Sequence, residues 1–190
     1  MSAPIAIQET EIPDVLEIRP PMFSDERGFF METHNQAVWS SVGFPHVFVQ
    51  DNLSLSHKGV LRGMHYQIAP HGMGKLIRVL SGAVYDVLVD LRRGSPTFGR
   101  WMGRELAEDQ PVWLYAPVGV AHGFLSLCDH ARVYYKCTYP YTPAAERAIR
   151  YDDRTIAINW PAAPALVSEK DARAPSFLEA DYNFIYERRP

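Results

Sequence analysis

Two short blocks, in which glycines stand at fixed distances from histidines, constrain the fold of this chain more than any other feature. Gly59 is followed after five intervening residues by His65, and Pro117-Val-Gly119 leads after two more residues to His122. Both blocks lie among short apolar runs separated by proline and glycine. Short apolar runs with turn residues between them are typical of a β-sandwich or barrel, so the sequence predicts an all-β fold.

The spacing of these blocks resembles the two sequence signatures of the cupin barrel, in which histidines and an acid bind a metal ion. Gln67 stands where that signature has its second histidine, and Lys75, separated from Gly82 by six residues, stands where it has the acid. An ammonium group cannot ligate a divalent cation, and an amide is a weaker ligand than imidazole. The resemblance predicts a cupin-type jelly-roll β-barrel with a few short peripheral helices and without a metal site.

Composition argues against several classes of protein. A length of 190 residues predicts one cupin-like domain over 1–190, and 47% hydrophobic residues is an ordinary share for a globular protein. A net charge of −3 without any basic block argues against a nucleic-acid partner. Because the chain shows neither a secretion signal nor an apolar run long enough to span a bilayer, we expect a cytoplasmic protein with no membrane contact.

Turn residues and period-two alternation predict ten strands and little helix. The expected strands are Val15–Arg19, Phe29–Thr33, Val47–Ser54, Val60–Gln67, Lys75–Leu80, Ala83–Leu91, Gly99–Leu106, Val112–Ala116, Gly123–Leu127 and Ala131–Thr138. A short helix is expected over Asn35–Val42, ended by Gly43, and one or two helical turns over Ser176–Tyr182.

Two of these strands place polar side chains where they bear on function. Asp86 lies in the middle of Ala83–Leu91 on a largely apolar face, so it either faces solvent or lines a polar cavity. Arg62 and His65 are three residues apart and would lie on opposite faces of a regular strand. Gly63 between them permits a β-bulge, which re-aims side chains next to active sites. We therefore expect Arg62 and His65 to enter one cavity.

A longer series of segments, from about residue 5 to about residue 180, resembles the dTDP-4-dehydrorhamnose 3,5-epimerase family in the family's own order. The segments are Phe23–Glu32, Gln50–Asn52, Gly59–Gln67, Lys75–Leu76, Asp86–Asp90, Ser95–Gly99, Pro117–Phe124, Tyr135–Lys136 and Ser168–Asp171. The resemblance implies a jelly-roll barrel, a homodimer that shares strands across its interface, and neither metal nor organic cofactor. It also implies a dTDP-4-keto-6-deoxyhexose substrate, inverted at C3 and C5 beside the ketone, and a product that feeds deoxysugar or rhamnose synthesis.

The resemblance gives four residues a catalytic role. His65 matches the family's base, a task that suits imidazole because it titrates near neutral pH, and Asp171 matches the dyad partner that fixes its tautomer. Lys75 matches the cation that stabilises the enolate, and Tyr135 matches the acid that returns the proton to the opposite face. Removal of a hydrogen beside a ketone needs this combination of a base, a stabiliser of the oxyanion and an acid.

Other residues match substrate-binding positions of the family. Arg62, by its position in the family pattern, is expected to bind the diphosphate. His122 and Asp86 resemble a second polar pair. The positions that match nucleotide contacts, the first three offered across the dimer, are Arg27, Phe30, Glu32, Gln50 and Asn52.

Four alternatives stay open on the sequence. Pro140 stands where many family members have an aromatic residue near the sugar, which leaves open an epimerase that inverts C3 alone. A 3,4-ketoisomerase on the same barrel uses overlapping proton chemistry. A metal-dependent cupin needs three or four convergent histidine and carboxylate ligands, and Gln67 and Lys75 argue against it. A non-catalytic sugar-nucleotide-binding cupin has no need of a base, its acid partner, a lysine and a tyrosine together.

Overall fold

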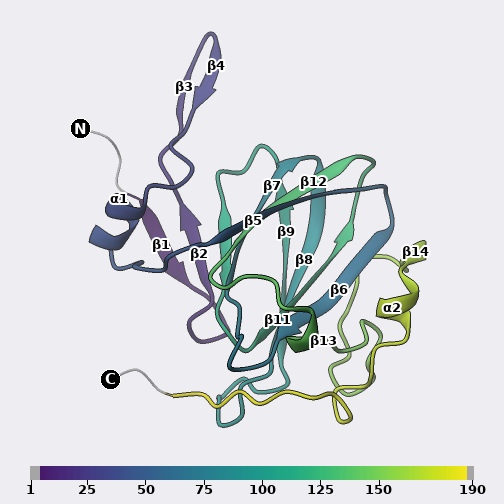
Figure 1. The fold of residues 1–190 in the computed structure, drawn as a ribbon. Helices are drawn as coiled ribbons and strands as arrows, with labels where there is room; N and C mark the ends of the chain where they lie inside the picture. The colour runs from purple at the N-terminus through teal and green to yellow at the C-terminus, as the bar shows by residue number, and fades with distance from the viewer. Residues whose placement is uncertain (1–4, 188–190) are drawn as a thin grey trace.

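The computed structural model describes residues 5–187 as two sheets packed face to face, with a separate hairpin (Figure 1). The first sheet has the order β1 (Ala6–Glu9), β2 (Leu16–Arg19), β10 (Trp113–Ala116), β7 (Lys75–Ser81), β12 (Ala131–Cys137) and β5 (Gln50–Ser56). The second has the order β13 (Glu146–Ala148), β6 (Val60–Gln67), β11 (Val120–Ser126), β8 (Ala83–Asp90) and β9 (Trp101–Ala107), with β14 (Leu166–Val167) parallel to β6. The hairpin pairs β3 (Phe23–Asp25) with β4 (Gly28–Phe30).

Helix is confined to the periphery. The two helices of the described residues are α1 (Gln36–Ser41) and α2 (Glu169–Ala172), and one turn of 3-10 helix covers Pro143–Ala145. Apart from the β14–β6 pair, the strands of both sheets run antiparallel to their neighbours. The expected all-β, cupin-type jelly roll with short peripheral helices is confirmed.

Alternation along β8 shows how the sequence separates two apolar layers. Val84 and Leu88 point into the core between the sheets, whereas Val87 and Val89 belong to a second cluster on the outer face of their sheet. The predicted period of two is therefore confirmed. Asp86 shares the inner face with Val84 and Leu88 and has no exposed surface, so it does not face solvent; nor does it line the cavity itself, but it hydrogen-bonds His122, which does.

The outer face of each sheet is covered by segments that carry large aromatic residues. Trp39 of α1 packs edge-on against Trp113 of β10, so α1 covers the first sheet. Phe177 and Phe184 from the C-terminal segment belong to the cluster that covers the second sheet. Asn35 caps α1 by accepting hydrogen bonds from the first-turn backbone, as its side chain favours at a helix start. This coverage leaves one end of the barrel free for a site.

A β-bulge lies in β6 at the predicted position. His65 is paired with His122 and Arg62 with Phe124, so β6 has one more residue than β11 over this stretch. Gly63 adopts φ +134°, and a Cβ there would lie 2.4 Å from the Cα of Gly123. Only glycine fits this close approach.

Some element boundaries differ from the expectation. β11 begins at Val120 rather than Gly123, because Gly123 is a mid-strand contact for the bulge and not a strand end. Ser176–Tyr182 was expected to hold one or two helical turns and holds one, in which the amide of Ala180 donates to the carbonyl of Ser176. The second helix lies earlier, at α2.

The β3–β4 hairpin projects away from the barrel (Figure 1). It carries Phe29 and Phe30, whose exposed fractions are 60% and 70%. Its strand β4 starts at Gly28, one residue earlier than expected, because Asp25 pairs with Gly28 and leaves only two residues for the turn. Large apolar side chains on a projecting hairpin are unusual on an isolated surface and mark a contact region.

Candidate active site

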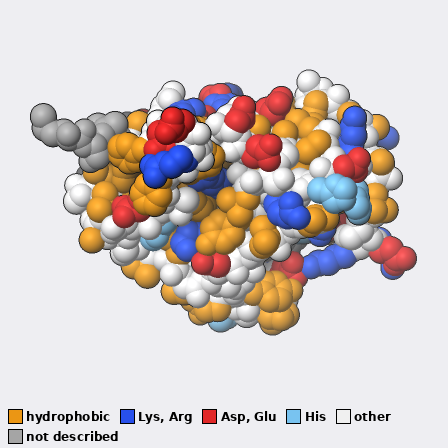
Figure 2. Space-filling view, turned by 90° about the horizontal axis from the view of Figure 1, so that it is seen from above, with side chains coloured by type: hydrophobic (Ala, Val, Ile, Leu, Met, Phe, Trp, Pro, Cys, Tyr) orange, Lys and Arg blue, Asp and Glu red, His pale blue; other side chains and the backbone are white. Residues whose placement is uncertain are grey.

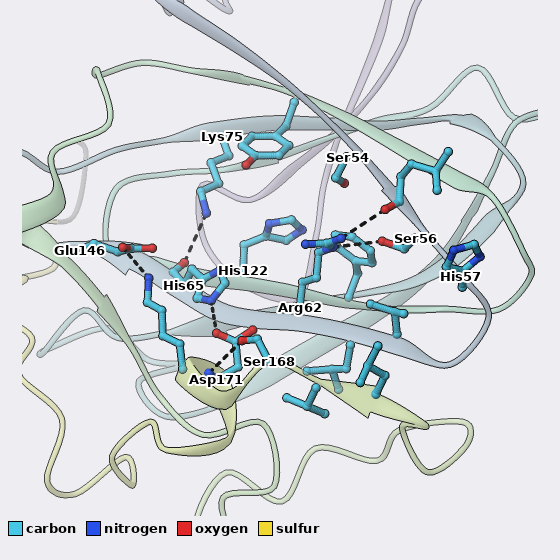
Figure 3. Close-up of a pocket in the computed structure, with 18 residues that line it drawn as sticks. Ser54, Ser56, His57, Arg62, His65, Lys75, His122, Glu146, Ser168 and Asp171 are labelled. Carbon is cyan, nitrogen blue, oxygen red and sulfur yellow. Dashed lines mark hydrogen bonds and ion pairs between the residues drawn. The ribbon is translucent and has the colours of Figure 1, made fainter.

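A cavity of about 570 Å³ opens between the two sheets and is closed on one side by α2. Figure 3 shows its lining side chains, which come from strands of both sheets and from α2. Seen from above, the molecule is hollowed, with basic side chains beside hydrophobic ones around the hollow (Figure 2). The predicted site residues that line the cavity are Arg62, His65, Lys75, His122, Tyr135 and Asp171.

His65 and Asp171 form a hydrogen-bonded pair between β6 and α2. Nε2 of His65 lies 2.7 Å from Oδ1 of Asp171, whose side chain is only 5% exposed. Burial opposes ionisation of Asp171, but hydrogen bonds and charge from His65, with the Gly63 amide and Ser168, lower the pKa of the carboxyl overall. A carboxylate only accepts, so Nε2 carries the proton and Nδ1 is left with its lone pair.

The short α2 helix places Asp171 in this pair. Ser168 is its N-cap, and its hydroxyl accepts a hydrogen bond from the backbone amide of Asp171. The backbone amide of Gly63 donates to Oδ2 of Asp171, at 3.4 Å. The carboxylate is therefore fixed from its own helix and from the bulge that also positions His65.

Lys75 and Tyr135 lie together on the opposite sheet. Nζ of Lys75 donates to the backbone carbonyl of His65 at 3.5 Å and lies 5.8 Å from the centre of the Tyr135 ring. Burial lowers the pKa of the Lys75 ammonium, and burial raises the pKa of the Tyr135 phenol. The cavity thus places a buried lysine side chain and a phenol across from an imidazole.

A second histidine–aspartate pair lies deeper in the barrel. Nε2 of His122 is 2.7 Å from Oδ2 of Asp86, and His122 lines the cavity whereas Asp86 is fully buried behind it. The other oxygen of Asp86 has no hydrogen-bond partner among the described residues. This pair presents a polar ring edge to the cavity from the floor of the barrel.

Arg62 lies at the mouth of the cavity. Its Nε donates to the Ser56 hydroxyl at 3.1 Å and one Nη donates to the Leu55 carbonyl at 3.2 Å. These bonds leave other N–H groups of an exposed guanidinium for an anion. Gln50 and Asn52 line an adjoining pocket of about 260 Å³, which shares His65, Lys75 and Tyr135 with the main cavity.

Three predicted site residues are not brought to this cavity within one chain. Arg27 and Phe30 lie on the projecting hairpin, where Arg27 forms an ion pair with Asp25. Glu32 follows the hairpin and accepts a hydrogen bond from Asn35 at 3.2 Å.

Several lining residues were not predicted as site residues from the sequence, and three of them are linked to one another by polar contacts. Lys170 stands beside Asp171 in a segment that the family resemblance had marked, and this position was the one signal for it. Glu146 lies on β13, a strand of three residues that the apolar pattern does not reveal, and forms an ion pair with Lys170. Tyr141 lines the adjoining pocket and donates from its hydroxyl to Glu146 at 2.7 Å.

The geometry suits proton transfer at carbon. Within residues 5–187 no three His, Cys, Asp or Glu side chains are grouped as metal ligands. In the same part of the chain, no helix has the length and apolar character needed to cross a membrane. An imidazole with a free lone pair, a cation and a phenol around one cavity are the groups that enolate chemistry requires.

Comparisons with known proteins agree with this geometry. The family model described as dTDP-4-dehydrorhamnose 3,5-epimerase matches residues 9–179. The chain is 50% identical to a Shigella flexneri protein of that name over 175 residues, covering 92% of this chain and 97% of the other. A Pseudomonas aeruginosa protein of the same name is 48% identical, with 90% and 94% covered.

Solved structures give the same answer. A Legionella pneumophila dTDP-6-deoxy-D-glucose-3,5-epimerase, crystallised with dTDP-4-keto-L-rhamnose, superposes with a TM-score of 0.91 at 42% identity, covering 97% of this chain and 100% of the other. A 3'-monoepimerase from Streptomyces bikiniensis, in complex with dTDP-quinovose, has a TM-score of 0.84 at 34% identity, with 90% and 87% covered. The chain therefore belongs to the dTDP-4-dehydrorhamnose 3,5-epimerase family.

Proposed function

We propose that this protein is a dTDP-4-dehydrorhamnose 3,5-epimerase, an isomerase that inverts C3 and C5 of a dTDP-4-keto-6-deoxyhexose. The observation that carries the proposal is the His65–Asp171 pair, which faces Lys75 and Tyr135 across one cavity. The family match over residues 9–179 supports the substrate class. A binding protein would need the nucleotide contacts but not this set of four.

The proposed reaction uses these residues in succession. Nδ1 of His65 takes the proton from the carbon beside the ketone, and the electron pair of the broken C–H bond moves to the ketone oxygen to give an enolate. Asp171 stabilises the imidazolium, and Lys75 stabilises the oxyanion. Tyr135 then protonates the carbon from the opposite face, which restores the ketone with inverted configuration. Proton exchange with solvent resets His65 and Tyr135.

Substrate binding is proposed for the polar residues around the mouth. Arg62 would hold the diphosphate, since its guanidinium is exposed and only partly engaged. Gln50 and Asn52 offer amides in the adjoining pocket, and the His122–Asp86 pair offers a ring edge from the floor. A Bacillus anthracis relative, 41% identical, was crystallised with TDP and PPi, which supports a dTDP-linked substrate.

We also propose that the protein works as a homodimer, with Arg27, Phe30 and Glu32 completing the site of the partner. The projecting hairpin supports this proposal, because it carries exposed Phe30 and none of its residues lines the cavity of its own chain. The edge strand β5 supports it too, since Leu53 is 61% exposed there. A single domain over 1–190, a cytoplasmic location and independence of metal and organic cofactors remain predictions.

Inversion of C3 alone is the second candidate. The likeness to a Streptomyces 3'-monoepimerase favours it, as does Pro140, whose ring offers no aromatic face to the sugar. Proton NMR of the product formed from dTDP-4-keto-6-deoxyglucose separates the candidates. Proton–proton couplings that show inverted configuration at both C3 and C5 are expected. Inversion at C3 alone would establish the monoepimerase, and unchanged substrate would refute the proposed epimerase.

A further inference from the structure

Gln67, which occupies a metal-ligand position of the cupin signature, has no part in the proposed reaction. It is only 4% exposed at the end of β6, and it lines the pocket that adjoins the main cavity. A buried amide must be satisfied by hydrogen bonds, so the partners of Gln67 indicate what its side chain does.

The hydrogen-bond partners of the Gln67 side-chain amide are backbone groups of loop residues. Nε2 donates to the carbonyl of His71 at 2.9 Å and to the carbonyl of Pro140 at 3.3 Å. Oε1 accepts from the backbone amide of Thr142 at 2.7 Å. Two carbonyl acceptors and one amide donor fix which end of the amide is oxygen. The side chain thus holds the peptide groups on both sides of Tyr141.

Tyr141 is the residue that this arrangement holds in place. It is 50% exposed, yet its backbone amide donates to Oε1 of Gln50 at 2.8 Å and its hydroxyl donates to Oε2 of Glu146 at 2.7 Å. Glu146 also forms an ion pair with Lys170, on the helix that carries Asp171. A half-exposed tyrosine is therefore tied at both ends beside the catalytic pair.

We propose that Gln67 is a positioning residue for the second inversion, because it holds the segment 139–142 so that Tyr141 forms a fixed wall of the adjoining pocket, which shares His65, Lys75 and Tyr135 with the main cavity. This inference rests on the proposed function. One base, His65, and one acid, Tyr135, serve both carbons, so the sugar must be inverted once, turn in the cavity and be inverted again. The wall retains the singly inverted sugar during that interval.

Gln67 therefore affects how the singly inverted sugar divides between leaving the cavity and being inverted again, and not the chemistry of either inversion. After the first inversion the sugar either leaves or presents its second carbon to His65. A loosened wall speeds departure, whereas the dyad, Lys75 and Tyr135 are unchanged. Loss of the Gln67 bonds should lower the ratio of second to first proton exchange by about fivefold or more, since one net hydrogen bond corresponds to roughly two- to tenfold.

The test uses the full chain with Gln67→Met, which keeps the shape without the amide, and Gln67→Glu, which sets a carboxylate against two carbonyls. Thr142→Ala is the matched control, because it removes only a hydroxyl bond to the Pro140 carbonyl at 3.3 Å. NMR in deuterated water with dTDP-4-keto-6-deoxyglucose follows singly and doubly deuterated sugar. Backbone amide exchange of Thr142 and the Kd for dTDP are measured on the same samples.

Accumulation of singly deuterated sugar is expected for both Gln67 variants and not for the control. Faster exchange of the Thr142 amide is expected for Gln67→Met, which removes the acceptor of that amide. The Kd for dTDP should stay within twofold of wild type in all three variants. An equal fall of both exchanges, with their ratio unchanged, would show a merely structural role and overturn the proposal. Unchanged protection of the Thr142 amide in Gln67→Met would also overturn it. Wild-type protein that exchanges neither carbon would refute the proposed function, whereas the amide measurement would still show whether Gln67 holds the segment.

Discussion

Asp171→Asn is the substitution that most sharply probes the catalytic pair. In the wild type, Oδ1 of Asp171 accepts from Nε2 of His65 at 2.7 Å, which leaves Nδ1 as the base. An asparagine at this buried position can present its NH₂ group to the ring. The imidazole would then accept at Nε2 and carry its proton on Nδ1, and this tautomer cannot take a proton from the sugar.

The size of the effect follows from these contacts. A hydrogen bond to a charged partner contributes about 1.5–3 kcal/mol, so its loss in the transition state alone lowers the rate by roughly 10- to 150-fold. The wrong tautomer adds to this, and the combined loss expected for a base and its orienting carboxylate is about 10²- to 10⁴-fold in kcat. Arg62 and the mouth of the cavity are untouched, so the Kd for dTDP should not change.

The assay is proton exchange at the sugar, followed by NMR, together with dTDP titration. Asp152→Asn is the matched control, because Asp152 pairs with Arg150 on the surface, away from the cavity lining. The control should keep wild-type kcat. If Asp171→Asn kept kcat within about threefold of wild type while folded, the tautomer argument would be wrong.

Three further predictions concern other groups of the site. Lys75→Met should lower kcat about 10²- to 10³-fold, because the enolate loses its stabilising cation. It should also raise the free energy of unfolding, measured with urea, by about 1 kcal/mol, because it removes a desolvated ammonium. The gain in stability should shrink as pH rises through the lowered Lys75 pKa towards 10.5, because the wild-type ammonium then loses its charge. A Lys75→Met protein less stable than wild type at neutral pH would contradict this prediction. Tyr135→Phe should retain deuterium exchange with unchanged configuration, which chiral analysis of the product checks. Gly63→Ala should lower the free energy of unfolding by about 3 kcal/mol or more. Gly94→Ala should lower it by only about 1 kcal/mol, because a Cβ at Gly94 meets nothing within 4 Å. Equal losses in the two variants would contradict the bulge argument.

Much of the barrel was predictable because its strands carry local signals. Alternation fixed the faces of Ala83–Leu91, and Gly63 between two polar residues indicated the bulge that turns Arg62 and His65 into one cavity. Those signals depend on neighbours in sequence. The predicted start of a strand at Gly123 was wrong, because in a sequence a glycine required by a tertiary contact cannot be told from one required by a turn.

The residues that sequence could not supply owe their place to long-range packing. Glu146 lies on a three-residue strand that exists only because it pairs with β6. The proposed role of Gln67 depends on the Pro140 carbonyl and the Thr142 amide, which lie far along the chain, so no local pattern predicts it. Asp171 was found through resemblance, since a lone aspartate in a four-residue helix carries no periodic signal.

The central claim is that His65 removes protons beside the ketone. The direct test is NMR of dTDP-4-keto-6-deoxyglucose in deuterated water with wild type, His65→Asn and His130→Asn. His130 is a suitable control because it lies outside the cavity lining at φ +60°, a conformation that asparagine tolerates. Loss of the C3 and C5 proton signals with wild type and His130→Asn, but not with His65→Asn, is the predicted result. Undiminished exchange in His65→Asn would contradict the account.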